Sequence, residues 1–260
     1  MRKIFQTFLY LIPIISMGQN VLNLNPIEIR DSGFDFTQEY IEKFNSAESI
    51  KNCEKVWSKI IAENRDIDNP TDKEKEILKY CDETKENPWN VDNGGCSWYC
   101  GGGLDINSAT SELQEQNGIN YKAENIHDLN YKTAWIEGVN GYGIGESITY
   151  DFPPENPRIT KIIVVNGYVK SENSWRNNSR VKRLKVYLNN KEFAILNLKD
   201  IKFGQVFEFK PIGIQKRENE KELKKMNRWN LRFEIMDIYK GEKYDDTAIT
   251  EIYFDGIDVH

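Results

Sequence analysis

The feature that most constrains the fold is a series of strand-like segments in the second half of the chain. In the first of them, Ile148, Tyr150 and Phe152 alternate with polar residues, which is the period of a strand with one buried face. The predicted strands cover residues 147–152, 159–165, 180–188, 193–198, 206–210, 229–236 and 247–254. Because no helical pattern alternates with them, a parallel βαβ sheet is disfavoured and we expect an antiparallel sandwich.

A small helical unit is predicted before the strands. Apolar residues recur at helical spacing in 36–44 and 50–61, and Thr71 with Glu74 forms a capping-box pattern that opens a third helix. The residues expected to face the interior of this unit include Ile50, Cys53, Trp57, Ile77, Leu78 and Cys81. The fold class is therefore mainly β, with a small N-terminal helical unit.

The N-terminus has the pattern of a secretory signal peptide. Arg2 and Lys3 precede an apolar run over 4–15, and small residues follow at Ser16 and Gly18. A single uncleaved membrane anchor is the alternative, although the run is short for a membrane span. We predict a signal peptide at 1–18 and no membrane span after its removal. The mature protein is expected to be secreted, periplasmic or at the cell surface.

Four cysteines fit an oxidising compartment. They allow three disulfide pairings, and we prefer Cys53 with Cys81 and Cys96 with Cys100. A zinc site is the competing interpretation, but no histidine lies between these cysteines and CxxC spacing is absent. With these landmarks the chain divides into a helical unit at 19–90, a Cys- and Gly-rich connector at 91–104, and a sandwich at 105–260.

The net charge of −6 argues against a nucleic-acid partner, because phosphate contacts require a basic excess. The sequence also has few of the side chains and motifs that nucleophilic catalysis requires. The histidines are His127 and His260, and neither GxSxG nor HExxH occurs. Asp245 and Asp246 are adjacent in sequence, so in a strand they point to opposite faces and are expected to fix a turn. We therefore predict that the protein is not an enzyme.

Several motifs in chain order carry a family resemblance. They are KTAWIEG (132–138), GYGIGE (141–146), VNGYVKSENSWRNNSRVKRLKVYLN (165–189) and EIMDIYKGEKYDDTAITEIYF (234–254). Together they resemble the discoidin-like, F5/8 type C-like domain of the bacterial NAD glycohydrolase translocation and glycan-binding family, over roughly residues 105–255. The resemblance implies a galactose-binding-like jelly-roll β-sandwich whose loops bind glycans. It does not extend to an NAD-cleaving domain.

The resemblance also implies a structural Ca²⁺. Discoidin-like sandwiches often hold this ion with an Asp, nearby carbonyls, a Thr hydroxyl and a late Glu, which are the hard oxygen ligands that Ca²⁺ prefers. The matching positions here are Asp128, the carbonyl of Tyr131, Thr133 and Glu251. The sequence departs from the family at Leu129, where many relatives carry Gly. In the alternative, Asp128 caps a turn and Glu251 forms a salt bridge.

A glycan site requires an aromatic face and planar polar groups for the hydroxyls. Trp175 stands among polar residues in the loop 167–180, where no apolar neighbour is in register to bury it. Its alternative role is a lid over the sandwich edge, because tryptophan is often only partly buried. The predicted ligand-binding residues are Tyr168, Trp175, Arg176, Arg180, Tyr244 and Asp245, with Tyr142 and Tyr239 as weaker candidates.

The function predicted from the sequence is non-catalytic binding of a glycan or glycosylated surface through the sandwich loops. One alternative is a protein–protein adaptor, in which the helical unit contacts a protein partner and the sandwich is a scaffold. A less favoured alternative is a hydrolase acting on NAD or a sugar, which would need carboxylates from separate strands in one pocket.

Overall fold

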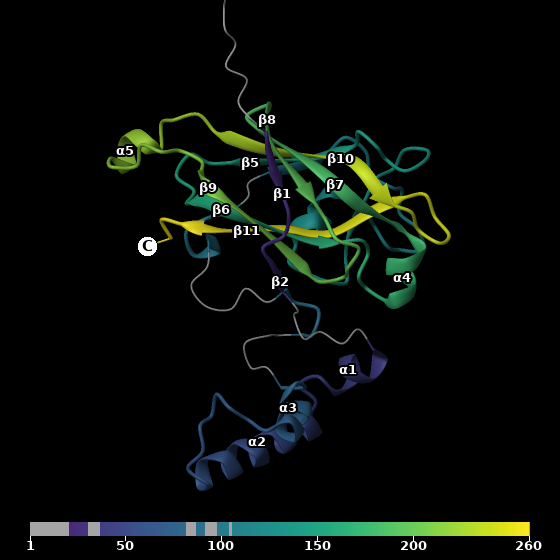
Figure 1. The fold of residues 1–260 in the computed structure, drawn as a ribbon, viewed down its shortest axis with the longest axis vertical. Helices are drawn as coiled ribbons and strands as arrows, with labels where there is room; N and C mark the ends of the chain where they lie inside the picture. Colours follow the sequence, from purple (N-terminus) through teal and green to yellow (C-terminus); the bar gives the residue numbers. More distant parts are fainter. Residues whose placement is uncertain (1–20, 31–36, 82–86, 92–97, 104–105, 260) are drawn as a thin grey trace, which may run out of the picture.

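The computed structural model describes residues 21–30, 37–81, 87–91, 98–103 and 106–259 (Figure 1). Its strands are β1 (Leu22–Leu24), β2 (Glu28–Arg30), β3 (Ile106–Ala109), β4 (Trp135–Ile136), β5 (Ser147–Phe152), β6 (Arg158–Asn166), β7 (Ser179–Leu188), β8 (Lys191–Asn197), β9 (Gly204–Ile212), β10 (Trp229–Tyr239) and β11 (Thr247–Ile257). Its α-helices are α1 (Gln38–Lys43), α2 (Ala47–Ala62), α3 (Asp72–Leu78), α4 (Glu172–Asn177) and α5 (Glu220–Leu223). Two 3₁₀ helices, η1 (Trp98–Cys100) and η2 (Ala123–His127), complete the described elements.

The strands form a continuous sheet that folds over on itself. Its main path runs β2-β9-β6-β11-β7-β10-β5-β3, while β4 pairs with β11 and β8 joins β7 to β1. The neighbours along this path are antiparallel except for β11 and β7, which share a short parallel contact at residues 247–248 and 179–180. The two halves face each other across one apolar core, which makes the fold a jelly-roll β-sandwich.

The core follows from the period-2 patterns of the strands. Ile148, Tyr150 and Phe152 of β5 are fully buried, and they meet inward residues of β10 and β11 such as Phe233 and Phe254. All seven predicted strands are confirmed, with ends that differ by a few residues. The sequence did not predict β1, β2, β3 or β4, which have only two to four residues each. Segments of that length carry too little periodicity to identify.

The helical unit forms as the capping and spacing patterns predict. Thr71 and Glu74 form the capping box of α3, and the predicted disulfide joins Cys53 of α2 to Cys81. The inward assignment was wrong for Ile50 and Ile77, whose side chains are exposed. The two helices cover only a narrow stripe of each other, and α2 buries Ser49, Cys53, Val56 and Ile60 along it. The predicted pairing of Cys96 with Cys100 involves a residue outside the described segments.

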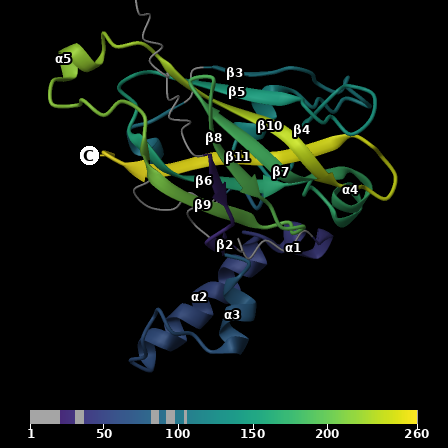
Figure 2. The same cartoon turned by 45° about the horizontal axis from the view of Figure 1, so that its top comes forward.

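The helical unit is attached to the outer face of the β6–β9–β11 half of the sandwich. Tyr40 of α1 belongs to a second apolar cluster that contains Ile163 and Val165 of β6, Val206 of β9 and Tyr253 of β11. These strand residues point away from the main core, so α1 and the segment after α3 cover an apolar face that would otherwise meet water. Helices α2 and α3 extend away from the sandwich beyond α1 (Figures 1 and 2).

Two features differ from the predicted segment boundaries. The segment 19–90 is not entirely helical, because β1 pairs with β8 and β2 pairs with β9 of the sandwich. In the connector, Trp98 is fully buried in the main core, against Phe152 and Phe254, and its indole N–H donates to the carbonyl oxygen of Pro157. The sandwich therefore includes η1. Within the described segments, no helix has the length and apolar character needed to cross a membrane.

Candidate functional site

The predicted site residues all lie at one end of the sandwich. Strands β5, β7 and β11 begin at this end, and strands β6 and β10 finish there. Helix α4 and the loop 240–246 lie at this end, and α5 lies at the opposite end (Figures 1 and 2). The arrangement therefore gathers three loops on one surface: 137–146 before β5, 167–178 between β6 and β7, and 240–246 between β10 and β11.

The loop 128–133 is held against β11 by a buried carboxylate. The backbone N–H of Asn130 donates to Glu251 Oε1 at 2.7 Å, while the Oε2 atom of Glu251 is buried and has no hydrogen-bond partner. Leu129 has a φ of +57°, the left-handed conformation that glycine adopts most easily. The loop therefore has the turn that a glycine adopts most easily, although the residue there is leucine. The Leu129 side chain packs against the second apolar cluster.

Two carboxylates lie close together here, that of Asp128 in the loop and that of Glu251 on β11. Burial and the nearby charge of Asp128 raise the pKa of Glu251 well above its usual value, and burial also raises the pKa of Asp128. The Thr133 hydroxyl lies 2.9 and 2.7 Å from the two carboxylate oxygens of Asp128. An orphaned carboxylate oxygen beside a second carboxylate and a hydroxyl is a donor set that suits Ca²⁺.

The described residues contain no group of three or more His, Cys, Asp and Glu side chains placed to hold a metal ion. A cation at this loop would therefore need to take its remaining ligands from carbonyl and hydroxyl oxygens. Such ligands are normal for Ca²⁺ and unfavourable for Zn²⁺. The donors thus fit the predicted ion, and the metal site stays a prediction.

The same loop forms hydrogen bonds with the segment that follows the helical unit. The N–H of Val91 donates to the carbonyl oxygen of Leu129 at 2.9 Å, and the N–H of Tyr131 donates to that of Trp89 at 2.8 Å. His127, directly before the loop, lies with its Nδ1 2.7 Å from the carbonyl oxygen of Ile252. Burial lowers the pKa of His127 to about 4, so the ring is neutral at pH 7 and Nδ1 carries the donated proton.

Two of the predicted glycan-binding residues are largely buried. Tyr168 is 6% exposed, and its hydroxyl donates to the carbonyl oxygen of Lys132. Burial raises the pKa of Tyr168 to about 12. Arg180 is 7% exposed and forms a two-pronged ion pair with Asp200. Both residues have structural partners, and their predicted contact with a ligand stays untested.

Trp175 and Arg176 both lie on α4. The indole N–H of Trp175 donates to the carbonyl oxygen of Asn166 at 3.1 Å, and the Arg180 guanidinium carbon lies 4.5 Å from the Trp175 ring centroid. Trp175 also packs against the second apolar cluster, which agrees with its alternative role as a lid. Arg176 is exposed and its side chain donates to Glu172 at 2.7 Å.

The remaining predicted residues, Tyr244 and Asp245, are exposed. Burial raises the pKa of Tyr121, and the charges of Tyr244 and Asp246 add to this effect. Tyr121 packs against a small cluster that includes Ala248 of β11, and the Thr247 hydroxyl donates to the carbonyl oxygen of Tyr142 at 2.9 Å, so both tyrosines lie near the start of β11, directly after the loop that carries Tyr244. Lys240 Nζ lies 4.9 Å from the ring centroid of Tyr142. We refer to the following residues together as the tyrosine surface: Tyr121, Tyr142, Lys240, Tyr244, Asp245 and Asp246.

Sequence reasoning missed Tyr121 and Lys240 and ranked Tyr142 low. Tyr142 lies between two glycines in GYG, a sign of an aromatic side chain presented by a tight loop. No comparable local signal marks Tyr121, because its position beside Ala248 of β11 depends on a segment more than 120 residues further along the chain.

A buried carboxylate supports the loop that carries Tyr142. Glu137 is fully buried, and its two oxygens accept from the N–H groups of Thr247 at 3.1 Å and Val139 at 2.9 Å. Gly143 crosses directly above it with a φ of +63°, so closely that a Cβ atom would lie 2.3 Å from the Cγ atom of Glu137. Burial raises the pKa of Glu137, and the charges of Asp246 and Glu146 add to this effect.

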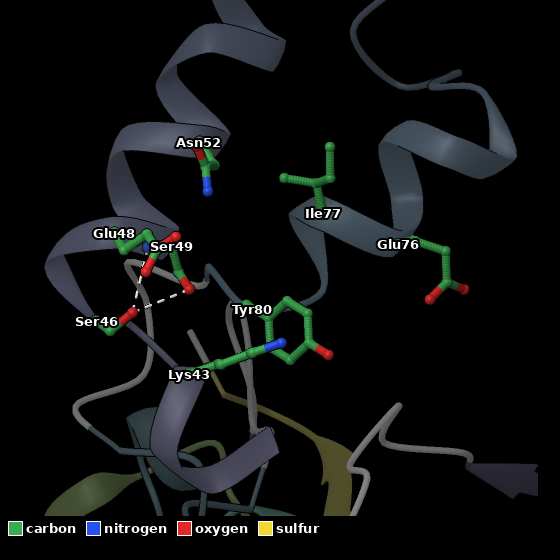
Figure 3. A pocket seen from close by; sticks show the side chains of 8 residues that line it. All are labelled: Lys43, Ser46, Glu48, Ser49, Asn52, Glu76, Ile77 and Tyr80. Carbon is green, nitrogen blue, oxygen red and sulfur yellow. Dashed lines mark hydrogen bonds between the residues drawn. The ribbon is translucent and has the colours of Figure 1, made fainter. Parts of the chain in front are cut away.

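A cavity of about 180 Å³ lies in the helical unit (Figure 3). Polar residues at the start of α2 form one side, where Ser46 bonds to Ser49, and Ile77 and Tyr80 form the other. The Lys43 side chain extends toward the Tyr80 ring, with Nζ 5.5 Å from its centroid. The cavity is smaller than most small-molecule sites, which span about 300–1,000 Å³. The predicted protein partner of this unit stays a prediction.

Several solved structures are similar to this chain. The chain is similar to the family 32 CBM from Clostridium perfringens NanJ, solved in complex with galactose, with 15% identity, coverage of 57% of this chain and 91% of that chain, and a TM-score of 0.38. It is also similar to CpGH89CBM32-5 from Clostridium perfringens, solved in complex with GalNAc-β-1,3-galactose, with 14% identity, coverage of 58% and 94%, and a TM-score of 0.39. No curated protein sequence matches the chain.

A family model provides the assignment. The model of the NAD glycohydrolase translocation F5/8 type C domain matches residues 98–255, which is more than half of the chain. The match begins at Trp98, the connector residue that is buried in the sandwich core. This chain belongs to the family of NAD glycohydrolase translocation F5/8 type C domains.

Proposed function

We propose that this protein is a non-catalytic glycan-binding protein that contacts its ligand through the tyrosine surface. The observation that carries the proposal is the position of Tyr121 and Tyr142 at the start of β11, next to the loop with the exposed residues Tyr244 and Asp245. A tyrosine ring offers an apolar face to a sugar ring, and its hydroxyl remains available for hydrogen bonds.

The charged groups complete the set that a sugar requires. Asp245 is exposed, and carboxylate oxygens accept hydrogen bonds from pairs of sugar hydroxyls. The ammonium groups of Lys240 and Lys243 lie over one face of the Tyr142 and Tyr244 rings, 4.9 Å from each ring centroid, and supply hydrogen-bond donors beside the opposite faces. We place the ligand here and not against Tyr168 or Arg180, because those two side chains are buried and already bonded.

A calcium ion belongs to the same proposal as a structural group. Asp128, Thr133, Glu251 and the carbonyl of Tyr131 would hold it, and the orphaned Oε2 atom of Glu251 supports this assignment. When bound, Ca²⁺ would neutralise the two facing carboxylates and fix the loop. Two hydrogen bonds orient the proposed ligands: the Asn130 N–H donates to Glu251, and the Thr133 hydroxyl donates to Asp128.

We place the action of the protein outside the cell. The disulfide between Cys53 and Cys81 is stable in an oxidising compartment, and the predicted signal peptide at 1–18 agrees with export. The segment 1–18 lies outside the described residues, so its role as a signal rests on the sequence pattern.

A glycan array tests the proposal. The mature protein is screened beside Tyr244→Ala, Tyr142→Ala and the control Tyr187→Ala, whose ring lies on the outer sheet face under Arg232. We expect binding that is lost in Tyr244→Ala and Tyr142→Ala and retained in Tyr187→Ala. Absence of binding to any glycan, or equal loss in all three variants, would contradict the proposed surface.

A further inference from the structure

Arg180 connects three parts of the loop end through one guanidinium group. Its Nε and Nη2 atoms donate to the two carboxylate oxygens of Asp200 at 2.8 and 2.9 Å. Its Nη1 atom lies 3.0 Å from the carbonyl oxygen of Asn178 and 3.4 Å from those of Trp175 and Arg176. The planar fork thus holds Asp200 on one side and the C-terminal carbonyls of α4 on the other.

Close packing beneath α4 holds the side chains of Arg180 and Trp175 in place. The Arg180 guanidinium stacks on Trp175, whose indole N–H is bonded to the carbonyl oxygen of Asn166 at the end of β6. Gly167 has a φ of +80°, and a Cβ atom there would lie 2.6 Å from Cγ of Arg180 and 2.8 Å from Cδ1 of Trp175. The backbone at Gly167 therefore touches both side chains and fixes α4 against the sandwich.

Helix α4 in turn supports the loop that carries Tyr244. The carbonyl oxygen of Arg176 accepts from the N–H of Glu242 at 2.9 Å, and that of Asn177 accepts from the N–H of Tyr244 at 2.8 Å. Gly241 lies so close to α4 that a Cβ atom would be 2.4 Å from the carbonyl oxygen of Asn177. One atom, the carbonyl oxygen of Arg176, thus accepts from both Arg180 and the Tyr244 loop.

We propose that Arg180 and Asp200 are positioning residues for the tyrosine surface, acting on Tyr244 through the carbonyls of α4. The proposal rests on the proposed function and gives Arg180 a role without direct ligand contact. Its physical basis is preorganisation, because a loop held in its binding conformation loses less entropy when the ligand arrives. Neutralising Asp200 weakens the fork, and the loop 240–246 then keeps its hydrogen bonds to Ser179 but is held less firmly by the carbonyls of α4.

The test compares Asp200→Asn with Asp200→Glu and with the matched control Asp258→Asn. Asp258 forms a similar two-pronged pair with Arg158, at 2.6 and 3.0 Å, near the opposite end of β11. Hydrogen exchange of the Glu242 and Tyr244 amides is measured by NMR, together with affinity for a glycan identified on the array. We expect Asp200→Asn to speed the exchange of these amides about tenfold and to weaken binding about tenfold.

Asp200→Glu keeps the carboxylate and should restore part of both effects, and Asp258→Asn should change neither. Arg180→Lys, which keeps the charge and loses the fork, should behave like Asp200→Asn. Unchanged exchange of the Glu242 and Tyr244 amides in Asp200→Asn would overturn the proposal, as would an equal effect of Asp258→Asn. If the native protein binds no glycan, the proposed function fails, and the exchange rates still decide whether Arg180 and Asp200 position the loop.

Discussion

The backbone N–H of Asn130 donates to the Oε1 atom of Glu251 at 2.7 Å and so joins a loop to a strand 121 residues away. The other carboxylate oxygen of Glu251 is buried without a partner, and the Asp128 carboxylate lies close enough to raise the pKa of Glu251. Two like charges in a poorly solvated place oppose folding unless a proton or a cation compensates them. This relationship makes Glu251 the residue at which the calcium proposal is tested most directly.

The first prediction concerns Glu251→Gln. We expect Ca²⁺ at about a hundred times its Kd to raise the Tm of the native protein by roughly 5 to 10 °C, and to leave the Tm of Glu251→Gln unchanged. In chelator, Glu251→Gln should unfold at or above the native temperature, because the neutral amide removes the repulsion from Asp128. Calorimetry measures both effects. The exposed residue Glu155 supplies the control variant Glu155→Gln, and a calcium response retained in Glu251→Gln would refute the site.

The second prediction concerns Tyr99, whose hydroxyl ties the connector to β11. It accepts from the N–H of Phe254 at 3.1 Å and lies 3.2 Å from Nε2 of His127, which is the acceptor in the neutral ring. Tyr99→Phe leaves the buried Phe254 N–H without a partner, and we expect a loss of about 1–3 kcal/mol in the free energy of unfolding. Urea denaturation measures this loss. Tyr187→Phe, on the outer sheet face, should cost less than about 0.5 kcal/mol, and equal costs would argue against this role.

The strands were predictable because a strand with one buried face alternates apolar and polar residues along its sequence. Ile148, Tyr150 and Phe152 are all fully buried as that period requires. The Cys53–Cys81 pairing was predictable for a similar reason, since Cys53 follows the apolar spacing of α2 and Cys81 continues the predicted spacing of the next helix, although α3 ends at Leu78. Strands β1 and β2 were not, because their positions depend on pairing with β8 and β9 more than 170 residues away.

The site was harder to predict than the fold. Arg180 looks like a ligand residue in sequence, and only the structure places it in a buried ion pair with Asp200. A buried arginine and an exposed one have the same local pattern, because the partner that makes burial tolerable comes from another loop. The packing of Tyr121 against Ala248, at the start of β11, has the same origin, since it arises where separate segments meet at one end of the sandwich.

The third prediction separates two effects of glycine in the loop that carries Tyr142. Gly143 and Gly145 both have a positive φ, of +63° and +96°, but a Cβ atom would clash with Glu137 only at Gly143. Alanine at either position should cost about 1 kcal/mol for the backbone conformation. We expect Gly143→Ala to cost about 1–3 kcal/mol more than Gly145→Ala, because the buried Glu137 cannot move without losing its bonds to Val139 and Thr247. Equal unfolding midpoints for the two variants would contradict the close contact.

The last prediction concerns the attachment of the helical unit to the sandwich. Tyr40 is 5% exposed and packs in the apolar cluster that includes Ile163 and Val165, so Tyr40→Ala removes a ring from the middle of this contact. We expect it to weaken the attachment by about 2–4 kcal/mol. Hydrogen exchange should then rise in α1 and at Val91, where the cluster loosens, while amides of β5 and β10 on the other half of the sandwich keep their protection. Ile61→Ala removes an equally apolar side chain that is 64% exposed, and it should leave all of these rates unchanged. Faster exchange in β5 and β10 as well would mean that the helical unit and the sandwich unfold as one cooperative body, and the face beneath α1 could not then be exposed separately.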